Sequence, residues 1–325
     1  MKFLYIASGG FGDASWTTSC PRILSEKGHN VDVYHLTYTG NVFHENPYCG
    51  KVVVSKKYGG LSRGDLKNQI IDVITDLIRR NCYDAVMFPN IGCGRMPEIV
   101  EGLNEFENIY VGPGLENTRT RKPLEIPGLK KGMIVGRPEF HFNSRELERA
   151  EKLSGRNSIV IFPMSSAVGE RTRNMNFDII NSCPFRDRFI VVHSGCDCLP
   201  ADNPKRFEES GIRVLWEGYN SSDADNEKVL GKILALEALC KFSIHGYSGS
   251  ICIALGFSKP FIMNVPCGQI RNNSSSPYAD TQERFNIFKG QMSYYKSTVL
   301  SSLCITEKEE EFTASIEQMD AAIKD

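Results

Sequence analysis

Short apolar runs alternate with helix-like stretches along the whole chain. Continuous apolar runs of this kind are typical of strands that are buried on both faces, as in parallel sheets. The alternation therefore predicts an α/β chain in which most strands are parallel. The runs lie at residues 3–6, 31–34, 52–54, 85–88 and 109–111 in the first half, and at 158–162, 189–193, 214–216, 242–244 and 261–263 in the second.

The stretches between these runs carry apolar side chains at helical spacing. In residues 66–80, isoleucine and leucine recur at positions that share one face of a helix. Residues 119–137 are instead rich in Gly, Pro, Lys and Arg, which predicts a long loop. Further helices are expected at residues 144–153, 177–182, 226–240, 250–255 and 307–323.

The chain length of 325 residues exceeds what one hydrophobic core usually supports, so two domains are expected. The strand pattern predicts one open, mostly parallel α/β domain at residues 1–140 and a second domain with another doubly wound sheet at residues 156–306. Two such sheets joined by one linker would face each other across a cleft at the carboxyl ends of their strands, where α/β domains bind ligands. The final segment, residues 307–325, is expected either to cross back over the domain junction or to form an exposed helical tail.

Charge and hydropathy restrict the partners and the location that we expect for this protein. Basic and acidic residues nearly balance, at 38 against 39, which weighs against nucleic acid as a partner without excluding it. No apolar stretch reaches the roughly 20 residues that a membrane span needs. The start at Met1 also runs too quickly into glycines for a secretory signal. We therefore expect a cytoplasmic protein.

The 11 cysteines are scattered along the chain, and Cys196-x-Cys198 is their one close pair. Structural zinc sites need two such pairs at suitable spacing, so the cysteines do not predict a zinc site. In a reducing compartment most of them are expected to be small buried hydrophobic residues.

The turn after the first strand carries the first candidate chemistry. Residues 9–13 read Gly-Gly-Phe-Gly-Asp, and glycines between a strand and a helix let the backbone approach a ligand closely. Asp13 adds a carboxylate, which serves either as a base or as the cap of its own helix. A nicotinamide site is disfavoured, because the third glycine of the dinucleotide motif is missing and the residues after Val33 are Tyr34-His35 instead of an acidic residue.

Three stretches of the chain carry a family resemblance. They are the 9–13 turn with Thr17-Thr18 after it, the strand at 159–162 with the loop after it and Arg171 and Arg173, and residues 229–260 with the turn Gly246-Tyr247-Ser248-Gly249-Ser250. In order and spacing they resemble the lipopolysaccharide heptosyltransferases, glycosyltransferase family 9, and the chain is similar to a divergent member. The resemblance implies the GT-B architecture, with two doubly wound Rossmann-like domains that face each other across a cleft.

The resemblance also implies an activity, that of an inverting glycosyltransferase of class EC 2.4. Such an enzyme moves a sugar from a nucleotide-diphosphate donor to an acceptor hydroxyl. Asp13 matches the family's general base, which takes the proton of the attacking hydroxyl. Arg173, or Arg171 before it, falls where the family has a lysine on the donor diphosphate, and a guanidinium can offset charge on the leaving group. Residues 1–140 would then be the acceptor domain and residues 156–306 the donor domain.

The other candidate site residues come from the same matches. On the donor side they are Arg171, Arg173, Glu217, His245, Gly246, Tyr247, Ser248, Gly249 and Ser250. On the acceptor side they are Gly10, Phe11, Gly12 and Asn90. Small residues in the 246–250 turn let backbone N–H groups reach the diphosphate. For His245, a histidine satisfied inside the protein at the end of a strand is an equally open interpretation.

No cofactor and no metal are expected, because the nucleotide-diphosphate sugar is the co-substrate. Asp223-Ala224-Asp225 is interpreted as the cap of the next helix rather than as a metal-binding motif. The acceptor would be a saccharide or a glycolipid, which leaves peripheral attachment to a membrane surface open. A protein or modified nucleic acid as acceptor would share the same donor chemistry.

Two departures from the family pattern favour an alternative function. Tyr247 replaces an acidic residue that is expected to contact the sugar, and Cys252 stands where a histidine is usual. Both changes fit a glycosyltransferase-like protein that binds a nucleotide or a glycan and has lost its catalytic activity.

Overall fold

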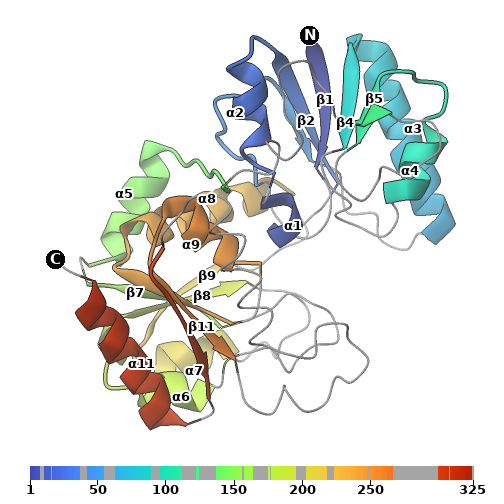
Figure 1. Ribbon diagram of the computed structural model, residues 1–325. Helices are drawn as coiled ribbons and strands as arrows, with labels where there is room; N and C mark the ends of the chain where they lie inside the picture. Colours follow the sequence, from blue (N-terminus) through green and yellow to red (C-terminus); the bar gives the residue numbers. More distant parts are fainter. Residues whose placement is uncertain are drawn as a thin grey trace. The chain divides into compact units, whose positions relative to one another are not determined.

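The computed structural model divides the chain into two compact units, Met1–His141 and Phe142–Asp325 (Figure 1). In the part of the chain that is described, no helix combines the length and the apolar character that crossing a membrane requires. The structure describes residues 1–7, 11–15, 17–36, 42–54, 63–88, 96–111, 122–123, 137–155, 157–163, 175, 177–194, 203–217, 223–246, 249–265, 299–306 and 308–323.

The first unit contains a six-stranded sheet in the order β3-β2-β1-β4-β5-β6, in which every pairing is parallel. Its strands are β1 (Lys2–Ala7), β2 (Asn30–His35), β3 (Val52–Val54), β4 (Ala85–Phe88), β5 (Ile109–Val111) and β6 (Lys122–Pro123). Its helices are α1 (Phe11–Ser15), α2 (Cys20–Ser25), α3 (Arg63–Asn81) and α4 (Met96–Gly102).

Helices cover both faces of the first sheet, as its apolar strands predict. Successive side chains of a strand point to opposite faces, and Leu4 and Ile6 of β1 pack with α3 and α4 in one buried cluster. On the other face, the thiol of Cys20 in α2 lies 3.6 Å from the sulfur of Met87 in β4. The unit is therefore doubly wound.

The second unit contains another six-stranded parallel sheet, in the order β12-β11-β10-β7-β8-β9. Its strands are β7 (Ile159–Phe162), β8 (Phe189–Ser194), β9 (Arg213–Glu217), β10 (Phe242–His245), β11 (Phe261–Val265) and β12 (Ser301–Ile305). Its helices are α5 (Ser144–Leu153), α6 (Phe177–Ser182), the 3₁₀ turn η2 (Arg186–Arg188), α7 (Asn203–Glu209), α8 (Asp223–Leu239), α9 (Ile251–Phe257) and α11 (Glu309–Ala322).

The two sheets have the same topology. When the strands of each unit are numbered along the chain, both sheets run 3-2-1-4-5-6, the order of dinucleotide-binding Rossmann folds. The strand order reverses between β1 and β4 in the first sheet and between β7 and β10 in the second. Ligands of such sheets bind beyond the carboxyl ends of the strands at this switch point. Each unit therefore has a defined location for a binding site.

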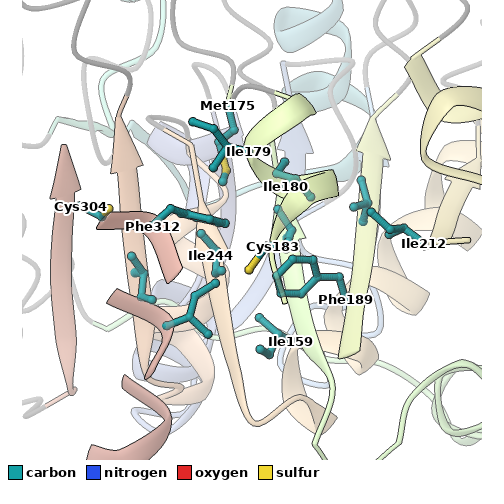
Figure 2. Packing of buried hydrophobic residues seen from close by; sticks show 14 of the residues in the cluster. Ile159, Met175, Ile179, Ile180, Cys183, Phe189, Ile212, Ile244, Cys304 and Phe312 are labelled. Carbon is teal, nitrogen blue, oxygen red and sulfur yellow. The ribbon is translucent and has the colours of Figure 1, made fainter. Parts of the chain in front are cut away.

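The last helix, α11, packs into the core of the second unit. Phe312 lies in one cluster with Ile180 of α6 and Ile244 of β10 (Figure 2), and Phe312 and Ile316 are fully buried. At the end of the helix, the two carboxylate oxygens of Asp320 accept hydrogen bonds from the Arg188 guanidinium at 2.8 and 3.2 Å. The sequence left open a tail or a helix that crosses back, whereas the helix belongs to the second unit.

The structure confirms the predicted fold class and adds several details. The second unit begins before residue 156, because α5 packs against α8 so closely that a side chain at Gly231 would collide with the carboxylate of Glu146. The stretch predicted as a loop, 119–137, contains the two-residue strand β6, which pairs with β5. Within the described residues, four further elements, α4, η2, α7 and β12, have no counterpart in the sequence prediction.

Candidate functional site

In the first unit, α1 follows β1 at the switch point of the sheet (Figure 1). Asp13 is the third residue of α1, so it does not cap this helix, contrary to one of the two interpretations of the sequence. The next helix, α2, has Ser19 as its N-cap residue. Gly12 also belongs to α1, and Phe11 is its first residue. The side chains of Phe11 and Asp13 lie outside the described part of the structure.

The backbone of α1 is fixed at its end by two buried threonines. The hydroxyl of Thr17 donates to the carbonyl of Ala14 at 3.0 Å, and the hydroxyl of Thr18 donates to the carbonyl of Ser15 at 2.9 Å. Thr18 also accepts a hydrogen bond from the backbone N–H of Glu139 at 2.7 Å. All these bonds are made within the first unit, so α1 presents Asp13 from a well-supported backbone.

Other polar groups near α1 serve packing rather than chemistry. The hydroxyl of Tyr5 donates to the carbonyl of Thr17, and burial raises its pKa well above the ordinary value. Burial likewise raises the pKa of the Cys20 thiol, and it raises the pKa of Cys49 to about 12. These groups stay neutral at physiological pH. Five of the seven cysteines in the described part of the chain are buried, as expected for small apolar side chains.

In the second unit, Phe162 and His245 mark the switch point. They are the last residues of β7 and β10 and are paired in register. Their rings are stacked, with centroids 4.6 Å apart and planes 5° apart. The next residue, Gly246, is buried and donates its backbone N–H to the Phe162 carbonyl at 2.9 Å. The chain thus enters the predicted donor turn from a fixed point.

His245 is held on both sides by serine hydroxyls. Its Nδ1 lies 2.9 Å from Ser250 Oγ, and its Nε2 lies 2.8 Å from Ser243 Oγ. Ser243 in turn donates to Oε1 of Glu237 at 2.6 Å. His245, Ser243 and Glu237 are all fully buried. The four side chains form a hydrogen-bonded chain from α8 through β10 to the turn before α9, which we call the 237–250 chain.

Burial sets the protonation of the 237–250 chain. It lowers the pKa of His245 to about 3, so the imidazole is neutral at physiological pH. It raises the pKa of Glu237 to about 7, against the hydrogen bond from Ser243 and the nearby charge of Lys259. Oε2 of Glu237 is buried and has no hydrogen-bond partner among the residues that the structure describes. The chain therefore contains one carboxyl group that titrates near neutral pH and one histidine that does not.

This geometry bears on the two interpretations of His245. Both ring nitrogens have partners within the second unit, and the ring is fully buried. The structure thus gives His245 the environment of a satisfied histidine at a strand end. Its role as a direct contact of the donor stays a prediction, and its partners Glu237 and Ser243 are not among the residues predicted from the sequence.

Two signals in the sequence could have identified these partners. Glu237 is an acidic residue inside the apolar run Ile233-Leu234-Ala235-Leu236, which continues to Leu239. A charged residue in such a run needs a buried partner. Ser243 stands two residues before His245 in the same strand, so both side chains project from the same face of β10.

The turn before α9 is compact. The N–H of Cys252 donates to the Gly249 carbonyl at 3.1 Å, and the N–H of Ile253 donates to the Ser250 carbonyl at 2.9 Å. Cys252 is 1% exposed, so its thiol packs in the core. Cys252 therefore does not present its side chain to a ligand at this turn.

The structure describes only some of the remaining predicted site residues. Glu217 is the last residue of β9 and pairs with Ser194, but its side chain is not described. Within the described residues, no group of three or more His, Cys, Asp or Glu side chains is arranged to hold a metal ion. The predicted residues Gly10, Asn90, Arg171, Arg173, Tyr247 and Ser248 lie outside the described part of the chain.

Comparisons with known proteins give structural matches. Comparison of the sequence with protein families and with curated proteins finds no match. Among solved structures, E. coli heptosyltransferase WaaC with ADP is 11% identical, covers 100% of both chains and has a TM-score of 0.62. E. coli ADP-heptose lps heptosyltransferase II is 11% identical over 98% of both chains, with a TM-score of 0.57. The glycosyl transferase family 9 protein from Veillonella parvula DSM 2008 is 14% identical over 98% of this chain and 96% of that chain, with a TM-score of 0.58.

These likenesses extend over nearly the full length of each compared chain. They agree with the two Rossmann-like sheets and show that the chain has the GT-B fold of glycosyltransferases. At such low sequence identity the likeness shows the fold, and function has to be argued from the site.

Proposed function

We propose that this chain is an inverting, metal-independent glycosyltransferase that moves a sugar from a nucleotide-diphosphate donor to an acceptor hydroxyl. The proposal rests on one observation, which is where two segments singled out in the sequence occur in the strand order. The helix with Asp13 follows β1, and the 246–250 turn follows β10, so each element named from the sequence borders the switch point of its own sheet. Full-length likeness to heptosyltransferases supports the same conclusion.

In this proposal Asp13 is the general base. As the acceptor oxygen attacks the anomeric carbon, the carboxylate takes the hydroxyl proton, and the nucleoside diphosphate leaves from the opposite face of the sugar. A base must be held within hydrogen-bond reach of that hydroxyl. The bonds from Thr17 and Thr18 to the end of α1 support the helix that carries Asp13.

On the donor side, the proposal assigns the diphosphate to the 246–250 turn and to the guanidinium groups of Arg171 and Arg173. Small residues such as Gly249 leave the backbone accessible to phosphate oxygens. Arginine offers fixed, charge-assisted hydrogen bonds to these oxygens and offsets the charge that builds on the leaving group. Glu217, at the end of β9, would border the nucleotide base.

The proposed partners are a nucleotide-sugar donor and a saccharide or glycolipid acceptor. One of the similar E. coli structures is that of ADP-heptose lps heptosyltransferase II and another is that of heptosyltransferase WaaC with ADP, so adenine nucleotides are the first donors to test. We also propose a cytoplasmic location, with peripheral binding to a membrane surface if the acceptor is a glycolipid.

A donor panel tests the proposed function. The full chain is screened by thermal shift against ADP, UDP, GDP, CDP and dTDP, and the corresponding sugar nucleotides are then assayed for release of the diphosphate with and without saccharide acceptors. The proposal predicts that at least one nucleotide raises the melting temperature and that its sugar derivative is cleaved. If nucleotides bind but no sugar nucleotide is cleaved or transferred with any acceptor, the chain is a binding protein of glycosyltransferase fold, the function that the change at Tyr247 favours.

A further inference from the structure

The 237–250 chain has a direction that follows from counting protons. When Glu237 is ionised, Ser243 donates its one hydroxyl proton to Oε1 of Glu237 at 2.6 Å. Its oxygen can then only accept from Nε2 of His245, 2.8 Å away. A neutral imidazole carries one N–H, so the proton is on Nε2 and Nδ1 is an acceptor. Nδ1 must therefore receive the hydroxyl proton of Ser250, 2.9 Å away.

This direction fixes the hydroxyl of Ser250. Its proton points inward to His245, although Ser250 itself is half-buried in the turn before α9. Two further contacts keep the ring of His245 in place, namely the stack on Phe162 at 4.6 Å and the edge-to-face contact with Phe261 at 6.0 Å. The ring therefore cannot rotate freely, and its nitrogens have fixed positions. Through Nδ1 this fixes the Ser250 hydroxyl in the turn before α9.

We propose that Glu237 is a positioning residue, which acts through Ser243 and His245 to orient Ser250 and thereby the 246–250 turn. The inference rests on the proposed function in one respect, that this turn holds the donor diphosphate. It also changes the role of Ser250. Because the Ser250 hydroxyl proton is used inside the protein, Ser250 contributes to the donor site by fixing the backbone of the turn and does not donate its hydroxyl to a phosphate.

The tautomer of His245 in the unmodified protein gives a direct test. Long-range ¹H–¹⁵N correlation spectra of ¹⁵N-histidine-labelled protein separate the two tautomers, and a His245→Asn spectrum assigns the signal among the six histidines. The measurement is made at pH 8, where Glu237 is ionised and accepts from Ser243. We expect the proton on Nε2. A proton on Nδ1 at this pH overturns the proposed direction.

Substitutions at Glu237 test the positioning role. In Glu237→Gln, the amide oxygen still accepts from Ser243, so the tautomer stays unchanged. In Glu237→Leu that acceptor is lost, and the Ser243 hydroxyl turns to Nε2. The imidazole proton then moves to Nδ1 and donates to Ser250. We therefore expect Glu237→Leu to reverse the tautomer, Glu237→Gln to preserve it, and Glu208→Leu, at an exposed site on α7, to leave it unaffected.

Nucleotide affinity links the tautomer to the donor turn. Using the nucleoside diphosphate that gives the largest thermal shift, we expect Glu237→Leu to raise Kd about 10-fold, as loss of one well-placed hydrogen bond does, and Glu237→Gln to change it less than about twofold. An unchanged Kd in Glu237→Leu despite a reversed tautomer overturns the positioning role. If the unmodified protein binds no nucleoside diphosphate, the proposed function fails, and the tautomer alone decides whether the 237–250 chain is directed as inferred.

Discussion

The imidazole of His245 lies flat on the ring of Phe162, with ring centroids 4.6 Å apart and planes 5° apart. The two residues end neighbouring strands, β10 and β7, at the point where the strand order of the second sheet reverses. The stack therefore fixes the base of the predicted donor turn. It also shields the imidazole from water, which contributes to the low pKa of His245.

The pKa of Glu237 predicts how stability depends on pH. Burial raises the pKa of this carboxyl from 4.5 in the unfolded chain to about 7 in the folded one. Between these values the folded state holds a proton that the unfolded state has released, so its contribution to stability is present at low pH and is lost as pH rises through 7. Glu237→Gln cannot titrate. Its free energy of unfolding, measured in urea, should therefore rise relative to that of the unmodified protein by up to about 3 kcal/mol when the pH increases from 4.5 to 8. A difference that is independent of pH contradicts the buried carboxyl.

His245 predicts the opposite dependence. Burial lowers its pKa from 6.5 to about 3, so between these values the unfolded state binds a proton that the folded state does not. The contribution of His245 to stability is therefore present above pH 6.5 and is lost as pH falls toward 3. In His245→Asn this loss is absent. Urea unfolding is therefore measured at pH 7 and at pH 5. The stability of the variant relative to that of the unmodified protein should be higher at pH 5 than at pH 7. No gain at pH 5 would mean that the ring is accessible to protons.

Packing of α11 predicts a large effect of truncating one side chain. Phe312 is fully buried in the core of the second unit. We expect Phe312→Ala to cost about 3–5 kcal/mol of unfolding free energy, which is typical of a buried phenylalanine. The matched control is Leu300→Ala, because Leu300 is 43% exposed. Equal stability of the two variants would show that α11 does not belong to the core of this unit.

The proposed mechanism predicts that chelators leave the transfer rate unchanged. In the proposed mechanism, Arg171 and Arg173 offset the negative charge of the leaving diphosphate. A divalent metal ion plays this role in many phosphate-transfer sites. Transfer is measured in buffer with EDTA and again after addition of excess Mg²⁺. The two rates should agree within about twofold, because a change of that size is no larger than the effect of one weak interaction. Loss of transfer in EDTA that Mg²⁺ restores contradicts this part of the proposal.

Much of the fold could be predicted from the sequence because its strands are buried on both faces. The runs at 52–54, 85–88 and 109–111 coincide with β3, β4 and β5, and the run at 158–162 contains β7. The strand β6 could not be predicted, since two residues in a stretch rich in glycine and proline carry no periodicity. β12 begins with Ser301-Ser302, which lacks the apolar pattern of the other strands.

The candidate site could be predicted less completely. Glycine turns after apolar strands point to the segments after β1 and β10, because small residues and strand ends are local features, and the binding role of these segments stays a prediction. The link between Glu237 and Ser250 is not local, since it passes through Ser243 and His245 and depends on which face of β10 meets α8. A single sequence shows that Glu237 is an acidic residue in an apolar helix, and the fold shows which residue satisfies it.

The central claim is that Asp13 removes the proton from the acceptor, and the Asp13→Asn variant tests it most directly. With the donor and acceptor found in the panel, transfer should fall by about 10²–10⁴-fold, the usual contribution of a general base, while Kd for the donor changes less than about twofold. Asp72→Asn, at an exposed position of α3 in the same unit, should transfer at the unmodified rate. Transfer by Asp13→Asn at the rate of the unmodified protein would contradict the account.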